Sequence, residues 1–215
     1  MEQFFGIDLI SFIKAAGYIG LFGIVFAESG VLLGFFFPGD SLLFTAGFLA
    51  SQGYFNIVIL TALAFAGAIL GDTVGYAFGK RIGPHIFKKE DSFFFRKDFI
   101  ERARIFYERH GGKTLIFARF MPVIRTFAPI LAGVGKMRYG VFLLYNFIGG
   151  ILWAIGITLL GYFLGTTVPH ADRYLIPIII FIIFTSFLPT IIHFARDRGR
   201  RKYIFSWIRA RFHFN

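Results

Sequence analysis

Residues 117–133, FARFMPVIRTFAPILAG, place two arginines and two prolines inside strongly apolar sequence. A guanidinium at the centre of a bilayer costs about 2.5 kcal/mol or more, so Arg119 and Arg125 must face a partner or a water-filled cavity. Pro122 and Pro129 oppose a straight helix, and broken backbone at membrane depth is tolerated only where protein or water satisfies it. We therefore expect a re-entrant hairpin that lines a cavity. A soluble loop between two helices is the alternative.

The composition is typical of a membrane protein. Of the 215 residues, 56% are hydrophobic and 16% are charged, whereas soluble domains carry about 25% charged residues. The chain has no cysteine, which excludes disulfides, a thiolate nucleophile and a cysteine-based metal site. The first residues, MEQFFGID, lack the basic region of a cleavable signal peptide. We expect an all-α membrane protein with a single domain, residues 1–215.

The net charge of +11 is concentrated in two segments. Residues 80–113 hold ten Lys or Arg against five acids, and residues 196–211 hold seven against one. An excess of basic residues marks the cytoplasmic side of a membrane protein and also attracts anionic headgroups. We expect both segments, with the tail at residues 196–215, to be cytoplasmic. Nucleic-acid binding is the alternative explanation, and we expect no such partner.

Hydropathy divides the remaining chain into a broken hairpin and three spans. A crossing helix needs about 20 apolar residues, so residues 17–50 are too short for two crossings. Pro38 and Gly39 break this segment into a hairpin. Residues 1–14 are interpreted as an interfacial segment. The expected spans are residues 55–78, 139–165 and 174–195.

Residues 84–112 differ in kind, because apolar and charged side chains recur with the period of a helix. Phe95, Phe99, Arg102 and Phe106 fall at i, i+4, i+7 and i+11, with charges on the opposite face. We expect an amphipathic helix on the cytoplasmic membrane surface. A helix packed on other protein is the alternative.

The two basic segments constrain the topology. Between residues 80–113 and the tail, the chain must cross the membrane an even number of times. The two later spans provide two crossings, so residues 117–133 cannot provide a third. The charge pattern therefore supports the re-entrant hairpin independently of its prolines, although the side of the N-terminus stays open.

The two halves of the chain, about residues 17–83 and 113–168, resemble each other weakly. The shared motifs keep offsets of 91 residues for the first two and 86 for the others: FAE at 26 with FAR at 117, Pro38 with Pro129, Ala46-Gly47 with Ala132-Gly133, and Gly75 and Gly79 with Gly161 and Gly165. One crossing per repeat inverts the second copy. We expect two opposed re-entrant hairpins, an arrangement that places a transporter's substrate site where they meet.

Five ionisable residues lie within the apolar segments: Glu28, Asp40, Asp72, Arg119 and Arg125. Buried charges need partners, so we expect the three acids to meet the two arginines at mid-membrane. A guanidinium binds phosphate bidentately, and a desolvated carboxylate can carry a proton. The alternative is a set of ion pairs that only stabilises the fold.

The motifs of common hydrolases and of phosphate-binding loops are absent. The histidines show no spacing typical of a metal site: His85, His110, His170, His193 and His213. We therefore expect a transporter-type protein, with no enzymatic activity, no cofactor and no metal. Trp153 and Trp207 are interpreted as interface anchors or packing residues.

Several motifs together carry a family resemblance: FAESG around Glu28, Pro38-Gly39-Asp40, GDTVGYAFGK at 71–80, YERHGGKTLIFARFMPVIRTFAPILAG at 107–133, and Gly161-Tyr162. Over about residues 17–165 the chain resembles the DedA family, also described as the VTT or SNARE-associated domain. Single motifs are common, but the combination is specific. Lys80 departs from the pattern, because arginine is more usual there.

The resemblance implies two opposed re-entrant hairpins and transport of membrane lipids that depends on the proton gradient. Bacterial members are associated with flipping undecaprenyl phosphate or phosphatidylethanolamine, and eukaryotic members resemble lipid scramblases. By the same resemblance, Glu28 and Asp40 would be the acidic functional pair, and Arg119 and Arg125 the essential arginines.

The sequence leads to the hypothesis of a proton-coupled translocase for phosphate-bearing lipids in the bacterial inner membrane. Arg119 and Arg125 bind the phosphate, Glu28 and Asp40 pair with them and take up protons, and Asp72 is a third acidic candidate. A proton-coupled exporter of cationic drugs or osmolytes and a membrane-homeostasis scaffold without transport are the alternatives. The expected partners are anionic lipid headgroups and protons, and homo-oligomerisation stays open.

Overall fold

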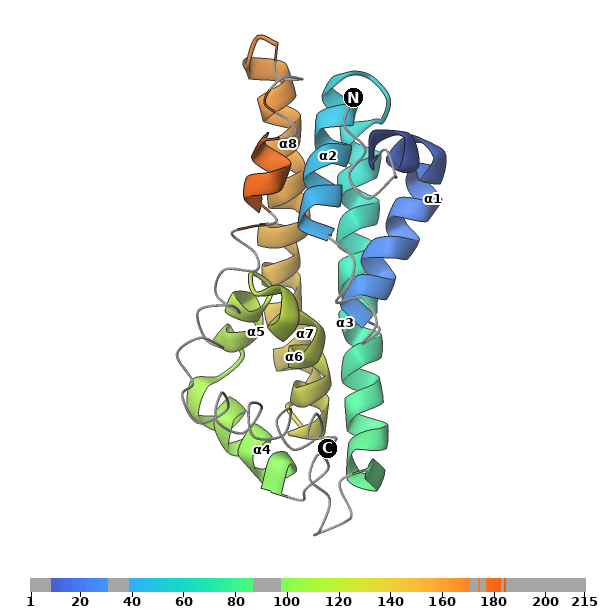
Figure 1. Ribbon diagram of the computed structural model, residues 1–215. Helices are drawn as coiled ribbons and strands as arrows, with labels where there is room; N and C mark the ends of the chain where they lie inside the picture. Colours follow the sequence, from blue (N-terminus) through green and yellow to red (C-terminus); the bar gives the residue numbers. More distant parts are fainter. Residues whose placement is uncertain are drawn as a thin grey trace, which may run out of the picture.

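The chain folds into a bundle of helices (Figure 1). The computed structural model describes residues 9–30, 39–86, 98–170, 174, 177–182 and 184. Within these ranges there is no β-strand, which confirms the all-helical prediction. The elements are α1 (Leu9–Gly30), α2 (Gly39–Ser51), α3 (Ile57–Ile86), α4 (Asp98–His110), α5 (Lys113–Ala118), α6 (Pro122–Val134), α7 (Tyr139–Gly150), a π-helical turn η2 (Ile151–Ile155) and α8 (Gly156–Thr167).

Three helical stretches are long and apolar enough to cross a membrane: Ile10–Gly30, Ile57–Gly83 and Tyr139–Thr167. The third consists of α7, η2 and α8 end to end. α3 continues to Ile86, beyond the end predicted at residue 78, because its last glycines pack on α6 and so favour the helix. The predicted span at 174–195 lies mostly outside the described residues, and the tail at 196–215 lies wholly outside them.

α1 begins earlier than expected, inside the predicted interfacial segment, and is long enough by itself to span a membrane. At Gly17 its backbone has φ of 58°, a left-handed conformation that glycine adopts without steric cost. The helix changes direction at this point. The part after Gly17 therefore rises only about 20 Å, which is less than the hydrocarbon thickness of a bilayer, about 30 Å.

Two pairs of shorter helices, α1 with α2 and α5 with α6, pack against the long ones (Figure 1). α1 and α2 approach each other near the middle of the molecule, and both extend from there to the end where α3 begins. α5 and α6 meet near the middle from the other side and open toward the end that carries α4. α3 and the α7–η2–α8 rod run along the whole length between these ends.

The second helix of each pair packs on a long helix of the other half of the chain: α2 on α8, and α6 on α3. These two helix–helix contacts, called the α2–α8 and α3–α6 seams, both depend on glycines. A Cβ at Gly79 would overlap the carbonyl oxygen of Ile130, and a Cβ at Gly161 would overlap that of Phe44. Small residues let apolar helices approach this closely where no water is present.

These contacts correct the register of the internal repeat. Phe44 and Ile130 occupy equivalent places and keep the predicted offset of 86 residues. Gly79, however, packs on Ile130 as Gly161 packs on Phe44, whereas the sequence match had paired Gly79 with Gly165. The long helices of the two halves therefore correspond with a shift of about one helical turn relative to the sequence match. The sequence alignment was wrong here because glycines recur every four residues along α3, so that several of them match the spacing of Gly161 and Gly165.

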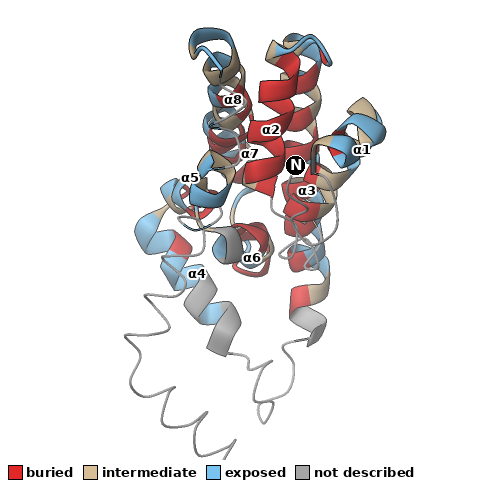
Figure 2. Cartoon of the chain, turned by 45° about the horizontal axis from the view of Figure 1, so that its top comes forward, coloured by how far each residue is buried: buried red, intermediate tan, exposed pale blue. Residues whose placement is uncertain are grey.

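Burial is concentrated in α2 and in the parts of α3 and α6 beside it (Figure 2). Residues 41–50 of α2 are all buried, as expected for an apolar helix at the centre of a bundle. Large apolar side chains on the outer faces of the α7–η2–α8 rod are exposed, which is typical of a lipid-facing surface: Leu144, Phe147, Leu152, Leu160 and Phe163.

The amphipathic helix predicted at 84–112 is shorter in the structure, where α4 covers Asp98–His110. Residues 87–97, including Phe95 of the predicted apolar face, lie outside the described residues. The Tyr107 hydroxyl donates a hydrogen bond of 2.8 Å to the carbonyl of Ala128 in α6. This contact supports the alternative of a helix packed on protein, while its place on the membrane surface stays a prediction.

Candidate functional site

Arg125 lies in the first turn of α6, at the middle of the molecule, and bridges two acids of the other half. Its Nη1 lies 2.7 Å from Asp40 Oδ1, at the start of α2, and its Nη2 contacts Glu28 Oε1, near the end of α1. Glu28 and Arg125 are buried, with 1% and 7% of their surfaces exposed. The predicted meeting of acids and arginines is present at this point.

The Glu28 carboxylate also lies against the N-terminus of α2. The backbone N–H of Gly39 donates a hydrogen bond of 3.3 Å to Glu28 Oε1, and an anion at a helix N-terminus is favoured by the unpaired N–H groups and the helix dipole. A Cβ on Gly39 would overlap the Glu28 carboxylate. Gly39 therefore contributes directly to the site.

The break in the second hairpin falls between α5 and α6, at residues 119–121. Pro122 is the first residue of α6, where its missing N–H and fixed φ are favourable. Pro129 lies inside α6, so the prediction that it breaks the hairpin is wrong. α6 continues there because Pro129 is buried in the seam with α3, and that packing outweighs one lost helical hydrogen bond. Pro38 lies outside the described residues.

Arg119 forms a second, separate cluster. Its Nη2 contacts both Asp72 Oδ2 on α3 and Asn146 Oδ1 on α7. The Asn146 amide in turn donates a hydrogen bond of 3.3 Å to the carbonyl of Ile69. The sequence analysis missed Asn146, although it is the only side-chain amide in the apolar segment 139–165.

Trp153 lies between the two arginine clusters. Its ring centre is 4.8 Å from Arg125 Cζ and 5.8 Å from Arg119 Cζ, within the range of cation–π attraction. Its Nε1 donates a hydrogen bond of 2.7 Å to Asp40 Oδ1. With 1% of its surface exposed, Trp153 is a packing residue and not an interface anchor, so the first of its two predicted roles is wrong and the second is confirmed. It belongs to η2, and π-helical turns occur often at functional sites.

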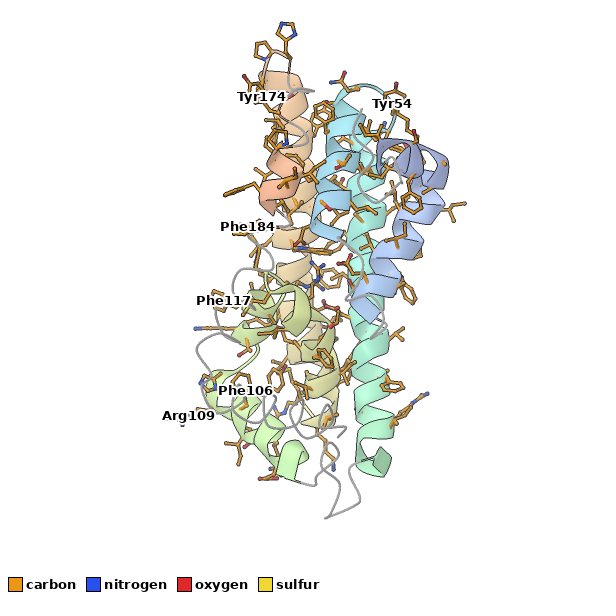
Figure 3. The ribbon with its side chains drawn as sticks, in the orientation of Figure 1. Tyr54, Phe106, Arg109, Phe117, Tyr174 and Phe184 are labelled. Atoms are coloured by element: carbon orange, nitrogen blue, oxygen red, sulfur yellow. The ribbon has the colours of Figure 1, made fainter. Side chains whose placement is uncertain are left out.

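The two clusters form one polar layer at mid-height of an otherwise apolar molecule, where Figure 3 shows nitrogen and oxygen atoms gathered between the hairpins. The layer holds three carboxylates and two guanidiniums, so one carboxylate exceeds the number of cations when all are ionised. Within the described residues, Glu28 Oε2 and Arg125 Nε are buried without a hydrogen-bond partner. Such a layer can accept an anion on its guanidiniums and protons on its carboxylates.

In the part of the chain that the structure describes, no group of three histidine or acidic side chains is arranged to hold a metal ion. The roles assigned from the sequence to Glu28, Asp40, Asp72 and the two arginines concern transport, which a static geometry does not test. The structure brings these residues together, and their functions stay predictions.

Comparison with known proteins gives relatives over most of the chain. A family model described as the VTT domain matches residues 37–163. Protein DedA of Escherichia coli K12 is 44% identical over 183 residues, which are 84% of this chain and 83% of that protein. An uncharacterized membrane protein of Mycobacterium leprae is 43% identical over 203 residues, 93% and 90% of the two chains. Inner membrane protein YghB of Escherichia coli K12 is 32% identical over 157 residues, 73% and 71%. No solved structure matches the chain.

Proposed function

This chain belongs to the DedA family of VTT-domain membrane proteins and is a multi-pass membrane protein, and we propose that it translocates a phosphate-bearing lipid across the bacterial inner membrane. The observation that carries the proposal is the layer of two buried guanidiniums, each paired with acids from the other half of the chain. Charges at this depth are expensive and mark transport pathways in membrane proteins.

The architecture supports a transport role. α2, α6 and the straight part of α1 are each too short to cross a bilayer. We infer that α1–α2 and α5–α6 are re-entrant hairpins that open on opposite sides, in an inverted repeat. The reciprocal seams α2–α8 and α3–α6 support this inference, because each half contributes one arm to the other half's long helix. Interrupted helices meeting at the midplane are typical of substrate sites.

The site favours a phosphate for three reasons. Arginine presents a planar fork that matches phosphate oxygens. Among the described residues the Arg125 Nε has no hydrogen-bond partner, so it retains a donor for an incoming anion. The N-termini of α2 and α6 both lie at the layer, beside Glu28 and Arg125, and helix N-termini stabilise anions. Undecaprenyl phosphate and phospholipids both carry the group that this site would bind.

Proton coupling follows from the charge balance. In the empty site, Glu28 and Asp40 share the Arg125 guanidinium. A phosphate that binds Arg125 displaces these carboxylates and brings further negative charge into the layer. Protonation of Glu28 and Asp40 neutralises this excess and frees the guanidinium for the lipid. Release of the protons on the other side restores the ion pairs.

The exporter of cationic drugs or osmolytes has less support. Such a substrate needs acids available for its positive charge. Each of the three acids in the layer instead contacts an arginine: Glu28 and Asp40 contact Arg125, and Asp72 contacts Arg119. A membrane-homeostasis scaffold without transport predicts that ionisation in the layer affects only stability.

The test replaces Arg125 with lysine in proteoliposomes and follows the initial rate of phosphate-lipid translocation. Loss of the bidentate fork should lower this rate by at least about tenfold, the value of one charge-assisted hydrogen bond. Arg109→Lys, on the exposed side of α4, is the matched control and should change the rate by less than about twofold. Full activity of Arg125→Lys would contradict phosphate binding by this guanidinium.

A further inference from the structure

A cavity of about 480 Å³ lies at the end of the molecule that carries α4, away from the central polar layer. Its walls come from α4, the turn between α6 and α7, and the first turn of α7. Its lining includes three cations and one acid: Arg104, Lys136, Arg138 and Glu108. None of the residues of the central layer contributes to this cavity.

The charges that line the cavity are unbalanced. Arg104 Nε lies 2.8 Å from Glu108 Oε1, one helical turn away on α4. In the described part of the chain, Lys136 and Arg138 form no ion pair. The cavity therefore keeps two positive charges that an anion can neutralise.

The turn that presents the two cations is held in one shape. The N–H of Met137 donates a hydrogen bond of 3.0 Å to the carbonyl of Ala132, and the Tyr76 hydroxyl bonds the Met137 carbonyl at 2.5 Å. Lys136 has φ of 55°, a left-handed conformation that is uncommon for a residue with a Cβ. A non-glycine residue in such a conformation costs energy and occurs more often at ligand sites than elsewhere.

The start of α7 adds donors to the cavity. Arg138 precedes the first turn of α7, and no side chain caps the free N–H groups there. Unpaired N–H groups at a helix start attract anions. On the opposite wall, burial raises the pKa of the Tyr107 phenol, so this side chain stays neutral and adds no negative charge.

The cavity also has an apolar exit along α7. Met137 and Val141 line it, and Val141, Leu144 and Ile148 are exposed at i, i+3 and i+7 on one face of α7. This face ends at Ile148, next to Gly149, where the Arg119 side chain packs against another side of α7. A headgroup in the cavity thus lies at the start of an apolar path toward the central layer. The lining suits an amphiphile with an anionic head.

We propose that this cavity binds the phosphate monoester headgroup of a membrane lipid, with an acyl chain along the Val141–Leu144–Ile148 face of α7. Movement of a bound lipid from this cavity to the central polar layer rests on the proposed function, whereas lipid binding in the cavity itself does not. Free phosphate shares the same chemistry, and the test separates these two sources.

The probe is dioleoyl phosphatidic acid with a photoreactive diazirine in one acyl chain, added to the detergent-solubilised full chain. Cross-links are mapped by mass spectrometry to residues 136–150. We expect saturable cross-linking to α7, with half-saturation at least about tenfold higher in Lys136→Gln/Arg138→Gln, because two charge-assisted contacts are lost. The same probe with a phosphatidylcholine head should cross-link weakly.

The matched control is Arg109→Gln/Lys113→Gln, which removes the same charge from neighbouring exposed residues that do not line the cavity. Figure 3 places Arg109 at the outer edge of α4. This control variant should shift the probe concentration at half-saturation by less than about threefold. An equal shift in both double variants would show diffuse attraction and overturn the proposal, as would unchanged cross-linking in Lys136→Gln/Arg138→Gln. Competition by inorganic phosphate as strong as that by phosphatidic acid would overturn the lipid assignment.

The proposed function and this inference fail in different ways. Cross-linking to α7 should persist in Arg125→Lys, although translocation falls. If α7 is cross-linked but no lipid is translocated, the central function is wrong and the cavity assignment stands. If translocation depends on Arg125 but cross-linking is unchanged in Lys136→Gln/Arg138→Gln, the cavity assignment is wrong and the proposed function stands.

Discussion

Trp153 connects the two arginine clusters through one side chain: its ring lies over Arg125 and its Nε1 donates to Asp40. Trp153→Phe keeps an aromatic ring and removes the hydrogen bond. We expect stability to fall by about 1–2 kcal/mol, because Asp40 loses a donor but keeps Arg125. Translocation should fall about threefold to tenfold, since Asp40 is positioned less firmly. Circular dichroism on heating and the proteoliposome assay measure the two effects.

The control for this prediction is Trp153→Leu, which removes the ring as well. Loss of the cation–π contact and of buried surface should make this variant less stable than Trp153→Phe. Equal stability of the two variants would show that the ring over Arg125 contributes nothing, and a Trp153→Phe protein with unchanged stability would contradict the hydrogen bond to Asp40.

Gly39 allows a second prediction at the scale of one residue. In Gly39→Ala the added Cβ overlaps the Glu28 carboxylate and pushes it away from Arg125. We expect a loss of about 1–3 kcal/mol of stability from overpacking and a reduction of translocation by about tenfold or more. Gly140→Ala is the matched control, because Gly140 lies in α7 with open space around its Cβ position. It should be neutral or stabilising. Similar losses in both variants would contradict the role of Gly39.

The sequence reveals charged site residues better than neutral ones. Arg119, Arg125 and the three acids stand out because an ionised group in an apolar segment needs a partner wherever the fold places it. Trp153 and Asn146 do not stand out, because an indole or an amide occurs in many spans for ordinary reasons. Their contacts with Asp40 and Arg119 depend on helices brought together by the fold.

At the scale of elements, the two reciprocal seams should respond alike to the same change. In Gly133→Ala the new Cβ meets the carbonyl of Tyr76, and in Gly47→Ala it meets the carbonyl of Thr158. Each substitution should cost about 1–3 kcal/mol by overpacking. The double variant should lose about the sum of the two, because distant sites act independently. Thermal unfolding followed by circular dichroism, with Gly140→Ala as control, measures these losses.

A seam that tolerates its alanine while the other does not would contradict the equivalence of α2–α8 and α3–α6. If the double variant loses much less stability than the two single variants together, the two seams form one coupled unit. Either result would remove the energetic support for two corresponding halves.

Element boundaries follow from the sequence only where local signals decide them. Gly39, Pro122 and the end of α4 before Gly111 agree with local turn and capping signals. α6 passes through Pro129 and α3 continues to Ile86 because contacts between these two helices support both. Such contacts between distant segments are not visible in a window of sequence.

At the scale of the whole molecule, the proposed insertion places the turn after α2 and the turn before α5 on opposite sides of the membrane. α3 alone rises about 45 Å over its 30 residues, which exceeds the thickness of the hydrocarbon core. The sequence predicted this arrangement from its charges, since the basic segment 80–113 marks one side. Which acid pairs with which arginine, by contrast, required the folded chain.

Because the chain contains no cysteine, single cysteines report this topology without background. Gln52, in the turn after α2, and Lys113, at the start of α5, are both exposed and are each replaced by cysteine. In intact bacterial cells with a permeabilised outer membrane, an impermeant maleimide should label position 52 and not position 113, and in inverted inner-membrane vesicles the reverse. Labelling of both from one side would contradict the single crossing by α3, and with it the opposed hairpins. If the two positions are labelled from opposite sides but with the sides exchanged, the opposed hairpins stand and the cytoplasmic assignment of the basic segment is wrong. The lipid-binding cavity beside α4 would then face the periplasm.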